Sequence, residues 1–234
     1  MQNLQKKPVI AFLPCRSGSE RVPRKNIRKF ATYRHGLIEI KLNQLLKCKT
    51  ILKIILSTND HDIIDFVSTF NDSKIIIDER SDELSSSATS TDDLINYSHS
   101  LIDDAHILWT HVTSPFVTAE KYTHIIKKYF TCVEEGYDSL MTVTPLYNFI
   151  WDDSGPINYD PEKEKWPRTQ SLKKLFDINS AVFLASDEIY KKFNNRIGKH
   201  PYLFTLDRLE GFDIDWEEDF ILAQELLIKN MVSI

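Results

Sequence analysis

The stretch VIAFLPCRSGSERVPRKNIRKF, residues 9–30, decides the fold of this chain. Its first five residues are apolar, a length that suits a buried parallel strand, and Pro14 ends the run. The loop that follows combines small residues with cations: Ser17, Gly18, Ser19, Arg16, Arg21, Arg24, Lys25 and Arg28. Approachable backbone amides, hydroxyls and cations after a strand suit the binding of a polyphosphate. A solvated basic turn is the alternative, because the pattern is neither a Lys-bearing P-loop nor a Gly-rich dinucleotide fingerprint.

Strand and helix patterns alternate along the chain that follows this stretch. Short apolar runs predict further strands at 51–56, 74–77, 105–109 and 139–143. Apolar residues at helical spacing predict helices at 37–46, after Asn59 or Asp60 as a cap, and at about 118–135. This rhythm predicts an α/β fold with a single, mostly parallel, doubly wound sheet. One catalytic domain, residues 1–234, is the simplest organisation for a chain of 234 residues.

The bulk composition restricts the partners. The net charge is −5, so we expect no general affinity for nucleic acid or for an anionic membrane, and the basic loop indicates a small anion. No run approaches the roughly 18 apolar residues of a membrane span, and the first apolar run is too short for a signal peptide. Three cysteines without a CxxC or Cys/His cluster indicate reduced thiols and no zinc site. We therefore expect a cytoplasmic protein.

Residues 78–91 form a segment rich in Ser and Thr that has two interpretations. Its composition is typical of a flexible linker. Ser90, with Asp93 three residues later, also forms a capping-box pattern before Leu94 and Ile95. Helix initiation therefore explains part of the hydroxyl content, and a binding role for Ser90 stays open beside it.

Helical and strand periodicity disappears from residue 145 to about residue 176, while Trp, Tyr and Pro accumulate. A segment of this length without a core pattern is functional, disordered or packed on another subunit. Its aromatic content argues against disorder.

An acidic pair follows near the C-terminus, at Asp213 and Asp215. Residues two apart on an extended chain face the same way, so these carboxylates should converge while Ile214 enters the core. Two carboxylates can form a binding site for Mg²⁺, which also accepts phosphate oxygens and water as ligands. Alternatively, Asp215 caps a helix that begins at Trp216, with Glu218 three residues later. That alternative leaves Asp213 unexplained.

These segments together resemble the acylneuraminate cytidylyltransferase family, the CMP-sialic acid synthetases that activate nonulosonic acids. The family's loop signature, P-A-R-x-G-S-x-R-x-P-x-K-N, corresponds to residues 14–26, with Cys15 for Ala and Glu20 for the common Lys. Five separately matched segments extend the resemblance from residue 9 to about residue 226. It implies a sheet of the nucleotide-diphospho-sugar transferase type and a basic loop that holds the phosphates and cytidine of CTP.

For the nucleotide, the resemblance implies contacts from two segments. Residues 80–91 match the family's R-P-x-E-L-A-x-D-x-A-S-T at Arg80, Glu83, Leu84, Ser90 and Thr91, and in the family this segment closes over the cytidine. The nucleotide-binding residues expected on this basis are Ser17, Gly18, Ser19, Asn26, Arg80, Ser90 and Thr91.

The sugar half of the site matches less well. His111 occupies the place of a Gln in Q-P-T-S-P that contacts the acyl sugar; a hydrogen bond to sugar hydroxyls is its simpler role and a general base is the alternative. Phe183 occupies the place of the Tyr in N-G-A-I-Y, and the P-R-x-Q motif is retained at residues 167–170. The resemblance implies that the sugar is bound by His111, Thr113, Ser114, Arg168, Gln170, Asn179 and Phe183.

The resemblance also implies the chemistry. The family's D-I-D-[T/S]-x-x-D, in which the first two Asp residues hold the catalytic metal, is matched at Asp213, Ile214, Asp215 and Asp219. We expect Mg²⁺ as the cofactor and Arg16, Lys25, Asp213 and Asp215 as the catalytic residues, in an enzyme that couples CTP to a sialic-like sugar acid and releases pyrophosphate. Another sugar acid of a surface polysaccharide and a catalytically idle nucleotide-binding homologue are the alternatives.

The resemblance implies a quaternary structure as well. In the family, the segment that corresponds to residues 145–178 is an arm that two protomers exchange, and it completes the neighbour's pocket. We therefore expect a homodimer.

Overall fold

The computed structural model describes residues 7–234, and its core is one twisted sheet. The strand order is β10-β5-β9-β4-β1-β2-β3. All neighbours pair in parallel except β9, which runs antiparallel to β4 and β5. The bounds of these strands are β1 Val9–Pro14, β2 Ile51–Thr58, β3 Ile75–Glu79, β4 His106–Thr110, β5 Ser139–Leu146, β9 Val182–Ser186 and β10 Pro201–Thr205. The predicted α/β class with a mostly parallel sheet is confirmed.

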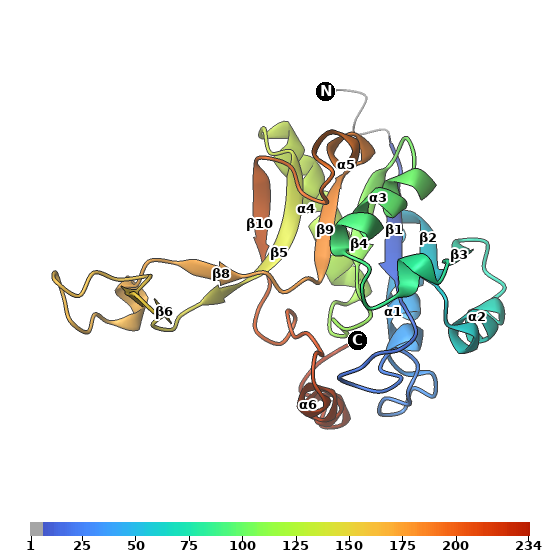
Figure 1. Ribbon diagram of the computed structural model, residues 1–234, viewed down its shortest axis with the longest axis horizontal. Helices are drawn as coiled ribbons and strands as arrows, with labels where there is room; N and C mark the ends of the chain where they lie inside the picture. The colour runs from blue at the N-terminus through green and yellow to red at the C-terminus, as the bar shows by residue number, and fades with distance from the viewer. Residues whose placement is uncertain (1–6) are drawn as a thin grey trace.

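Helices cover both faces of the sheet (Figure 1). Side chains alternate along β1, so Ala11 and Leu13 enter a core with α1, α4 and α6, while Phe12 enters a second core with α3 and α5. The helices are α1 Gly36–Lys47, α2 His61–Ser68, α3 Thr91–Leu101, α4 Ala119–Glu134, α5 Asp187–Phe193 and α6 Glu217–Ile228, with 3-10 turns η2 Glu83–Ser85 and η3 Thr169–Ser171. Asp60 caps α2, one of the two expected positions. No helix in the described part of the chain is long and apolar enough to cross a membrane.

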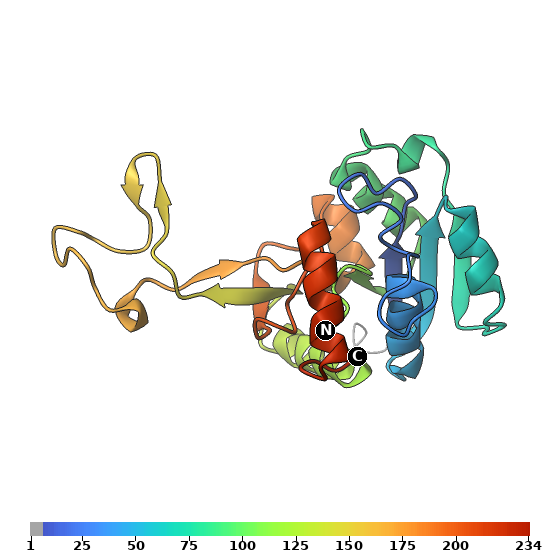
Figure 2. The ribbon, with the colours of Figure 1, turned by 90° about the horizontal axis from the view of Figure 1, so that it is seen from below.

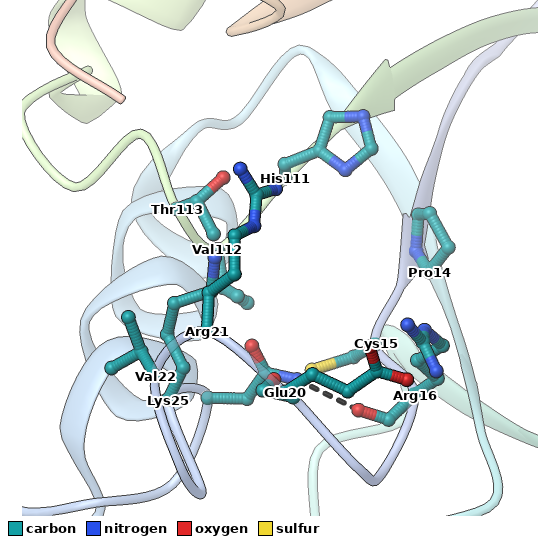
Figure 3. A pocket seen from close by; sticks show the side chains of 12 residues that line it. Pro14, Cys15, Arg16, Glu20, Arg21, Val22, Lys25, His111, Val112 and Thr113 are labelled. Carbon is teal, nitrogen blue, oxygen red and sulfur yellow. Dashed lines mark hydrogen bonds between the residues drawn. The ribbon is translucent and has the colours of Figure 1, made fainter. Parts of the chain in front are cut away.

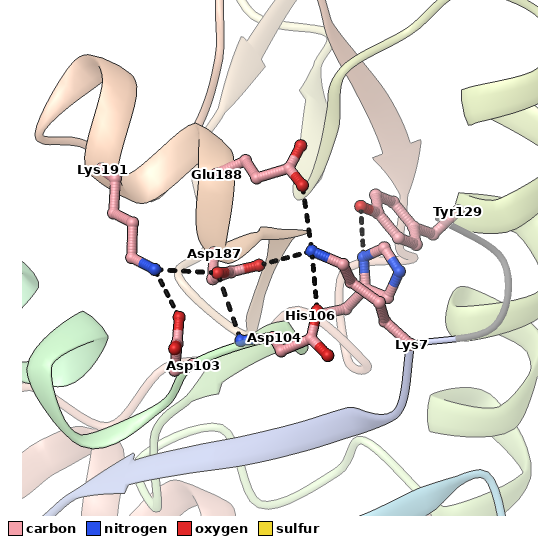
Figure 4. Close-up of polar contacts among 8 residues, drawn as sticks. All are labelled: Lys7, Asp103, Asp104, His106, Tyr129, Asp187, Glu188 and Lys191. Atoms are coloured by element: carbon pink, nitrogen blue, oxygen red, sulfur yellow. Dashed lines mark hydrogen bonds and ion pairs between the residues drawn. The ribbon is translucent and has the colours of Figure 1, made fainter. Parts of the chain in front are cut away.

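An ion-pair network fastens the amino-terminal edge of the sheet (Figure 4). Lys7, just before β1, contacts Asp104, Asp187 and Glu188 at 3.2, 3.3 and 2.9 Å. The hydrogen bond with Glu188 raises the pKa of Lys7 against the lowering effect of burial, and Asp104 and Asp187 add to the rise. This network joins the starts of β1 and β4 to α5, and it lies at the end of the strands opposite to the loops discussed below.

Residues between β5 and β8 (Leu175–Asp177) project from the body as an arm (Figures 1 and 2). β5 continues past the main sheet to pair with β8, and a small hairpin, β6 (Trp151–Asp152) with β7 (Gly155–Pro156), lies beyond. Asn158 is buried inside the arm and bonds the backbone of Asn148 and Ile150. Trp166 is 71 % exposed. The arm is therefore folded by its own contacts and presents aromatic side chains to its surroundings.

Candidate active site

A pocket of about 380 Å³ opens at the carboxyl edge of the parallel strands, where the loops after β1 and β4 face each other (Figure 3). The β1 loop lines it with Arg16, Arg21 and Lys25, and the β4 loop lines it with His111 and Thr113. The carboxyl ends of strands are the usual place for ligands in doubly wound sheets. The predicted basic loop is thus part of a concave site rather than a fully solvated turn.

Hydrogen bonds between side chains and the backbone fix the conformation of the β1 loop. The backbone N–H of Ser17 donates to Asn59 Oδ1 at 2.9 Å, and the side-chain amide of Asn26 donates to the carbonyl of Arg16 at 2.9 Å. Gly18 has a φ of +72°, in the left-handed region that favours glycine. Asn26 is buried, with 8 % of its surface exposed, so its side chain stabilises the conformation of the loop.

The cations of this loop contact the C-terminal acidic segment directly. Arg21 pairs with Asp215 at 2.9 Å, and Lys25 Nζ donates to the carbonyl of Ile214 at 2.7 Å. Burial lowers the pKa of Lys25, and the charges of Asp215 and Asp213 oppose that shift. The chain therefore brings together the two charged segments that the sequence predicted as catalytic.

Arg16 differs from the other loop cations. Arg21, Arg24 and Arg28 form ion pairs with Asp215, Asp62 and Glu217. Within residues 7–234 the Arg16 guanidinium has no ion pair or hydrogen bond, and it lies at the pocket wall (Figure 3). Its charge is available for an anion in the pocket.

Asp213 is a buried carboxylate with an unused oxygen. Its Oδ1 is inaccessible to solvent and has no hydrogen-bond partner in the described chain. Burial raises the pKa of Asp213 and the charge of Asp215 adds to the rise, while a hydrogen bond with Thr113 and the charge of Lys25 oppose it. Ile214 is fully buried between the two acids, as predicted. Residues 213–215 lie in a loop before α6, so the expected position on a strand end is wrong.

A different residue caps α6. Asp219 Oδ2 accepts from the backbone N–H of Trp216 at 2.8 Å and of Asp215 at 3.0 Å. The alternative in which Asp215 and Glu218 form the cap is therefore wrong. The carboxylate of Asp215 therefore does not cap the helix and accepts a hydrogen bond from Arg21.

The second predicted nucleotide segment lies beside the pocket. Arg80 is 3 % exposed; its Nε donates to Ser85 at 3.1 Å and its Nη1 has no partner in the described chain. Burial lowers the pKa of Arg80, opposed by the nearby Cys15. Ser90 forms a capping box with Asp93 at the start of α3, and neither Ser90 nor Thr91 lines the pocket. The geometry accounts for Ser90 by helix capping.

His111 is a neutral hydrogen-bonding group. The indole N–H of Trp109 donates to His111 Nε2 at 2.9 Å, so the ring proton resides on Nδ1. Burial lowers the pKa of His111 to about 3, with Arg196, Lys41 and Lys25 adding to the shift. A ring whose Nε2 is already engaged and whose Nδ1 carries the proton has no free base nitrogen. The hydrogen-bonding role fits this geometry and the general-base role does not.

The structure separates the other predicted sugar-binding residues. Thr113 lines the pocket, whereas Ser114 and Phe183 are buried and do not line it. Asn179 donates to Thr144 Oγ1 at 3.0 Å and lines a second cavity of about 880 Å³ that also contains Asp213. Arg168 and Gln170 lie in the arm, away from the body of their own chain (Figure 1). The last two do not join the site of the chain that carries them.

Two cations near the site, one buried and one partly buried, were not predicted. Lys41 of α1 is fully buried, and its Nζ donates to the carbonyl of Ser114 and the hydroxyl of Tyr122, both at 2.8 Å. Burial lowers the pKa of Lys41 to about 7, opposed by the charge of Asp213. A lysine among the apolar positions of a predicted helix is a signal that sequence reasoning could have used. Arg196 follows α5 and had no such signal.

Comparison with known proteins defines the family of the chain. A family model for cytidylyltransferases matches residues 10–231. The chain belongs to the cytidylyltransferase family. The resemblance deduced from the motifs is confirmed, and the chain is a nucleotidyltransferase of this family.

Curated relatives and solved structures agree with this assignment. A pseudaminic acid cytidylyltransferase of Campylobacter jejuni is 24 % identical, with 96 % of this chain and 98 % of that protein covered. An N-acylneuraminate cytidylyltransferase of Escherichia coli is 23 % identical over 92 % of this chain, which spans about half (51 %) of that protein. A CMP:2-keto-3-deoxy-manno-octonic acid synthetase structure complexed with CTP superposes with a TM-score of 0.67 at 11 % identity, covering 95 % of this chain and 99 % of that chain. The structural likeness shows the fold.

Proposed function

We propose that this cytidylyltransferase is a Mg²⁺-dependent enzyme that couples CTP to a sialic-like nonulosonic acid, giving a CMP-sugar and pyrophosphate. The observation that carries the proposal is the contact between the cationic β1 loop and the acidic segment: Arg21 pairs with Asp215, and Lys25 donates to the carbonyl of Ile214, the residue between the two acids. The names of the relatives support a sugar acid as the second substrate, since they include pseudaminic acid and N-acylneuraminate cytidylyltransferases.

The residues present fit a magnesium ion. Asp213 offers a buried oxygen without a partner in the described chain, and Asp215 offers a second carboxylate two residues away. This matches a hard cation that takes two carboxylates and completes its shell with phosphate oxygens and water. When bound, the ion supplies positive charge at the α-phosphate and lowers the pKa of the attacking hydroxyl.

The side chains of the enzyme act on the phosphates. The anomeric hydroxyl of the sugar acid attacks the α-phosphorus of CTP and loses its proton to solvent. A new P–O bond forms, and the bond from that phosphorus to the bridging oxygen breaks as pyrophosphate leaves. Arg16, which has no counter-ion among residues 7–234, and Lys25 stabilise the charge that develops on pyrophosphate. Arg21 neutralises Asp215 in the free enzyme and becomes available when a cation takes its place. No side chain in the described site is assigned as the general base.

We further propose that the arm, residues 145–178, is exchanged between two protomers. The arm leaves its own body, exposes Trp151 and Trp166, and carries Arg168 and Gln170 away from its own pocket. A second copy of the chain would bring these polar residues to the neighbouring site. A particle of dimer mass at micromolar concentration in light scattering is the expected result, and a monomer at that concentration would contradict the proposal.

A panel of acids tests the activity. Purified protein, CTP and Mg²⁺ are mixed in turn with N-acetylneuraminate, legionaminate, pseudaminate and 3-deoxy-octulosonate, and pyrophosphate release is followed. We expect release with at least one sialic-like acid and none after chelation of the metal. Turnover with 3-deoxy-octulosonate alone would favour the cytidylyltransferase of a different sugar acid. A CTP-dependent rise in melting temperature without turnover would indicate an idle homologue.

A further inference from the structure

One side of the site carries hydrogen-bond donors for which the described chain supplies no acceptor. The Arg196 guanidinium lies 3.7 Å above the ring centroid of Phe183 and 5.3 Å from that of Trp109. Within residues 7–234 it makes no hydrogen bond or ion pair, although a guanidinium offers five N–H donors. Burial lowers its pKa, opposed by the nearby Tyr190. A partly desolvated cation whose donors are unused is costly unless a ligand accepts them.

Neighbouring groups add donors to the same place. The Nδ1–H of His111 has no partner in the described chain, and Arg196 is the largest charge acting on this ring. The hydroxyl of Tyr190 is buried, has no hydrogen-bond partner among the described residues, and lies within electrostatic reach of Arg196. Trp109 pairs directly with Phe183 across β4 and β9, which places this group of donors next to the loop that His111 begins. The missing component is an acceptor, and most simply an anion.

The turn that carries Arg196 is held rigidly. Asn194 is left-handed with a φ of 47°, and the side chain of Asn195 accepts the backbone N–H of Ile197 at 3.3 Å. Gly198 N–H then donates to Ser139 Oγ at 2.9 Å, and Lys199 N–H donates to Asp138 at 2.7 Å. Because the turn is fixed to the start of β5, little backbone entropy is lost when Arg196 binds a ligand.

We propose that Arg196, stacked on Phe183 beside His111, binds the carboxylate of the sugar acid. The inference rests on the proposed function, and it adds a specificity-determining residue that the motifs do not contain. A planar guanidinium matches a carboxylate through two parallel N–H···O bonds, and the Phe183 ring fixes the plane in which they form. The neutral His111 donates without adding a charge.

Variants of this residue test the assignment. Arg196→Met removes the charge and keeps a flexible apolar stem, Arg196→Lys keeps the charge and loses the fork, and Lys192→Met is a matched control on the exposed side of α5. With an accepted acid, we expect Arg196→Met to raise KM for the acid about 10- to 100-fold, since a charge-assisted hydrogen bond is lost. KM for CTP should stay within about twofold. The KM of Arg196→Lys for the acid should lie between those of the parent and Arg196→Met. Lys192→Met should have the KM values of the parent.

The carboxamide analogue of the acid identifies the group that is bound. In the parent enzyme the analogue should lose affinity by a factor similar to the effect of Arg196→Met; in the variant, acid and carboxamide should bind alike. The assignment is overturned if the losses of affinity from removing the carboxylate and from removing Arg196 are independent of each other. It is also overturned if Arg196→Met keeps the parental melting temperature and CTP affinity and its KM for the acid is unchanged. If Arg196→Met does not fold, the same comparison in Arg196→Lys decides. Absence of turnover with any acid in the parent enzyme would instead overturn the proposed function.

Discussion

The two halves of the site differ in how their charges are balanced. In the half built by the β1 loop and residues 213–215, Arg21 pairs with Asp215 and Lys25 donates to the carbonyl of Ile214, so most cations of the loop have partners and Arg16 is the exception in the described chain. In the half built by β4 and β9, Arg196 and His111 present donors that no described residue accepts. Contacts within the chain therefore position most charged groups of the first half, while the donors of the second half require a bound ligand. Substitutions in the first half should mainly change turnover, whereas substitutions in the second half should mainly change affinity for the sugar acid.

The largest effect should come from Asp213→Asn, in the half built by the β1 loop and residues 213–215. This variant loses one carboxylate of the proposed metal-binding site, and Lys25→Met loses the cation beside that site. We expect turnover to fall about 10³-fold or more in each variant. The folded-state pKa of Asp213 is raised above its unfolded value, so its ionisation at neutral pH opposes folding and Asn removes that penalty. Pyrophosphate release and urea denaturation at pH 7 measure both quantities.

Asp62→Asn is the matched control for this pair. It breaks the exposed ion pair with Arg24 at the rim of the same loop and should leave turnover within about twofold. Near-parental turnover in Asp213→Asn and Lys25→Met would remove the catalytic assignment. A large loss of stability in Asp213→Asn would show that its carboxylate holds the fold together, contrary to the orphaned state of its Oδ1.

The next effect concerns Lys41, a buried cation behind both halves that lacks a counter-ion within hydrogen-bonding distance in the described chain. Its pKa is about 7 when folded and about 10.4 when unfolded. The unfolded state therefore binds more protons between these values, and stability from this group rises with pH by up to about 1.4 kcal/mol per unit. We expect Lys41→Met to lose that slope between pH 7 and 9 in urea denaturation.

The control for Lys41→Met is Lys47→Met, at the exposed end of the same helix. This variant removes an equal charge from solvent, so the difference in unfolding free energy from the parent should not change with pH. If the parent and Lys41→Met show parallel pH dependence, the buried ammonium is matched by a group that the contacts do not reveal, and the contrast between balanced and unbalanced charges loses one of its supports.

Local patterns predicted most of the fold because burial imposes periodicity on strands and helices. The run at residues 9–13 became β1, and the pattern at about 118–135 became α4 with Thr118 as its cap. β9 was not predicted as a strand, although its five residues are all buried and begin with an apolar run like that of β1. Its antiparallel direction depends on the path of the arm, which is a long-range property.

Sequence patterns nominate site residues that stand in motifs, but they do not reveal residues that only packing brings together. Arg16, Lys25 and Asp213 stand in motifs whose charges have an evident use. Arg196 depends on the turn at residues 194–200 reaching Phe183, and no spacing in the sequence contains that contact. Ser114 matched its motif but is fully buried, with its carbonyl bonded to Lys41. A motif identifies residue types, whereas the surrounding packing decides which of them face the ligand.

The smallest effect concerns Ser90, for which helix capping and nucleotide binding make different predictions. Ser90→Ala removes the side-chain acceptor of the Asp93 N–H and should lower stability by about 1 kcal/mol. Ser90→Asp keeps a good cap and should restore stability, while its negative charge would repel a nucleotide phosphate nearby. If Ser90 only caps α3, KM for CTP will be parental in Ser90→Asp. If Ser90 touches the nucleotide after the segment closes, KM for CTP will rise in Ser90→Asp although the melting temperature is restored, and the nucleotide half will then depend on a movement that the free structure does not display.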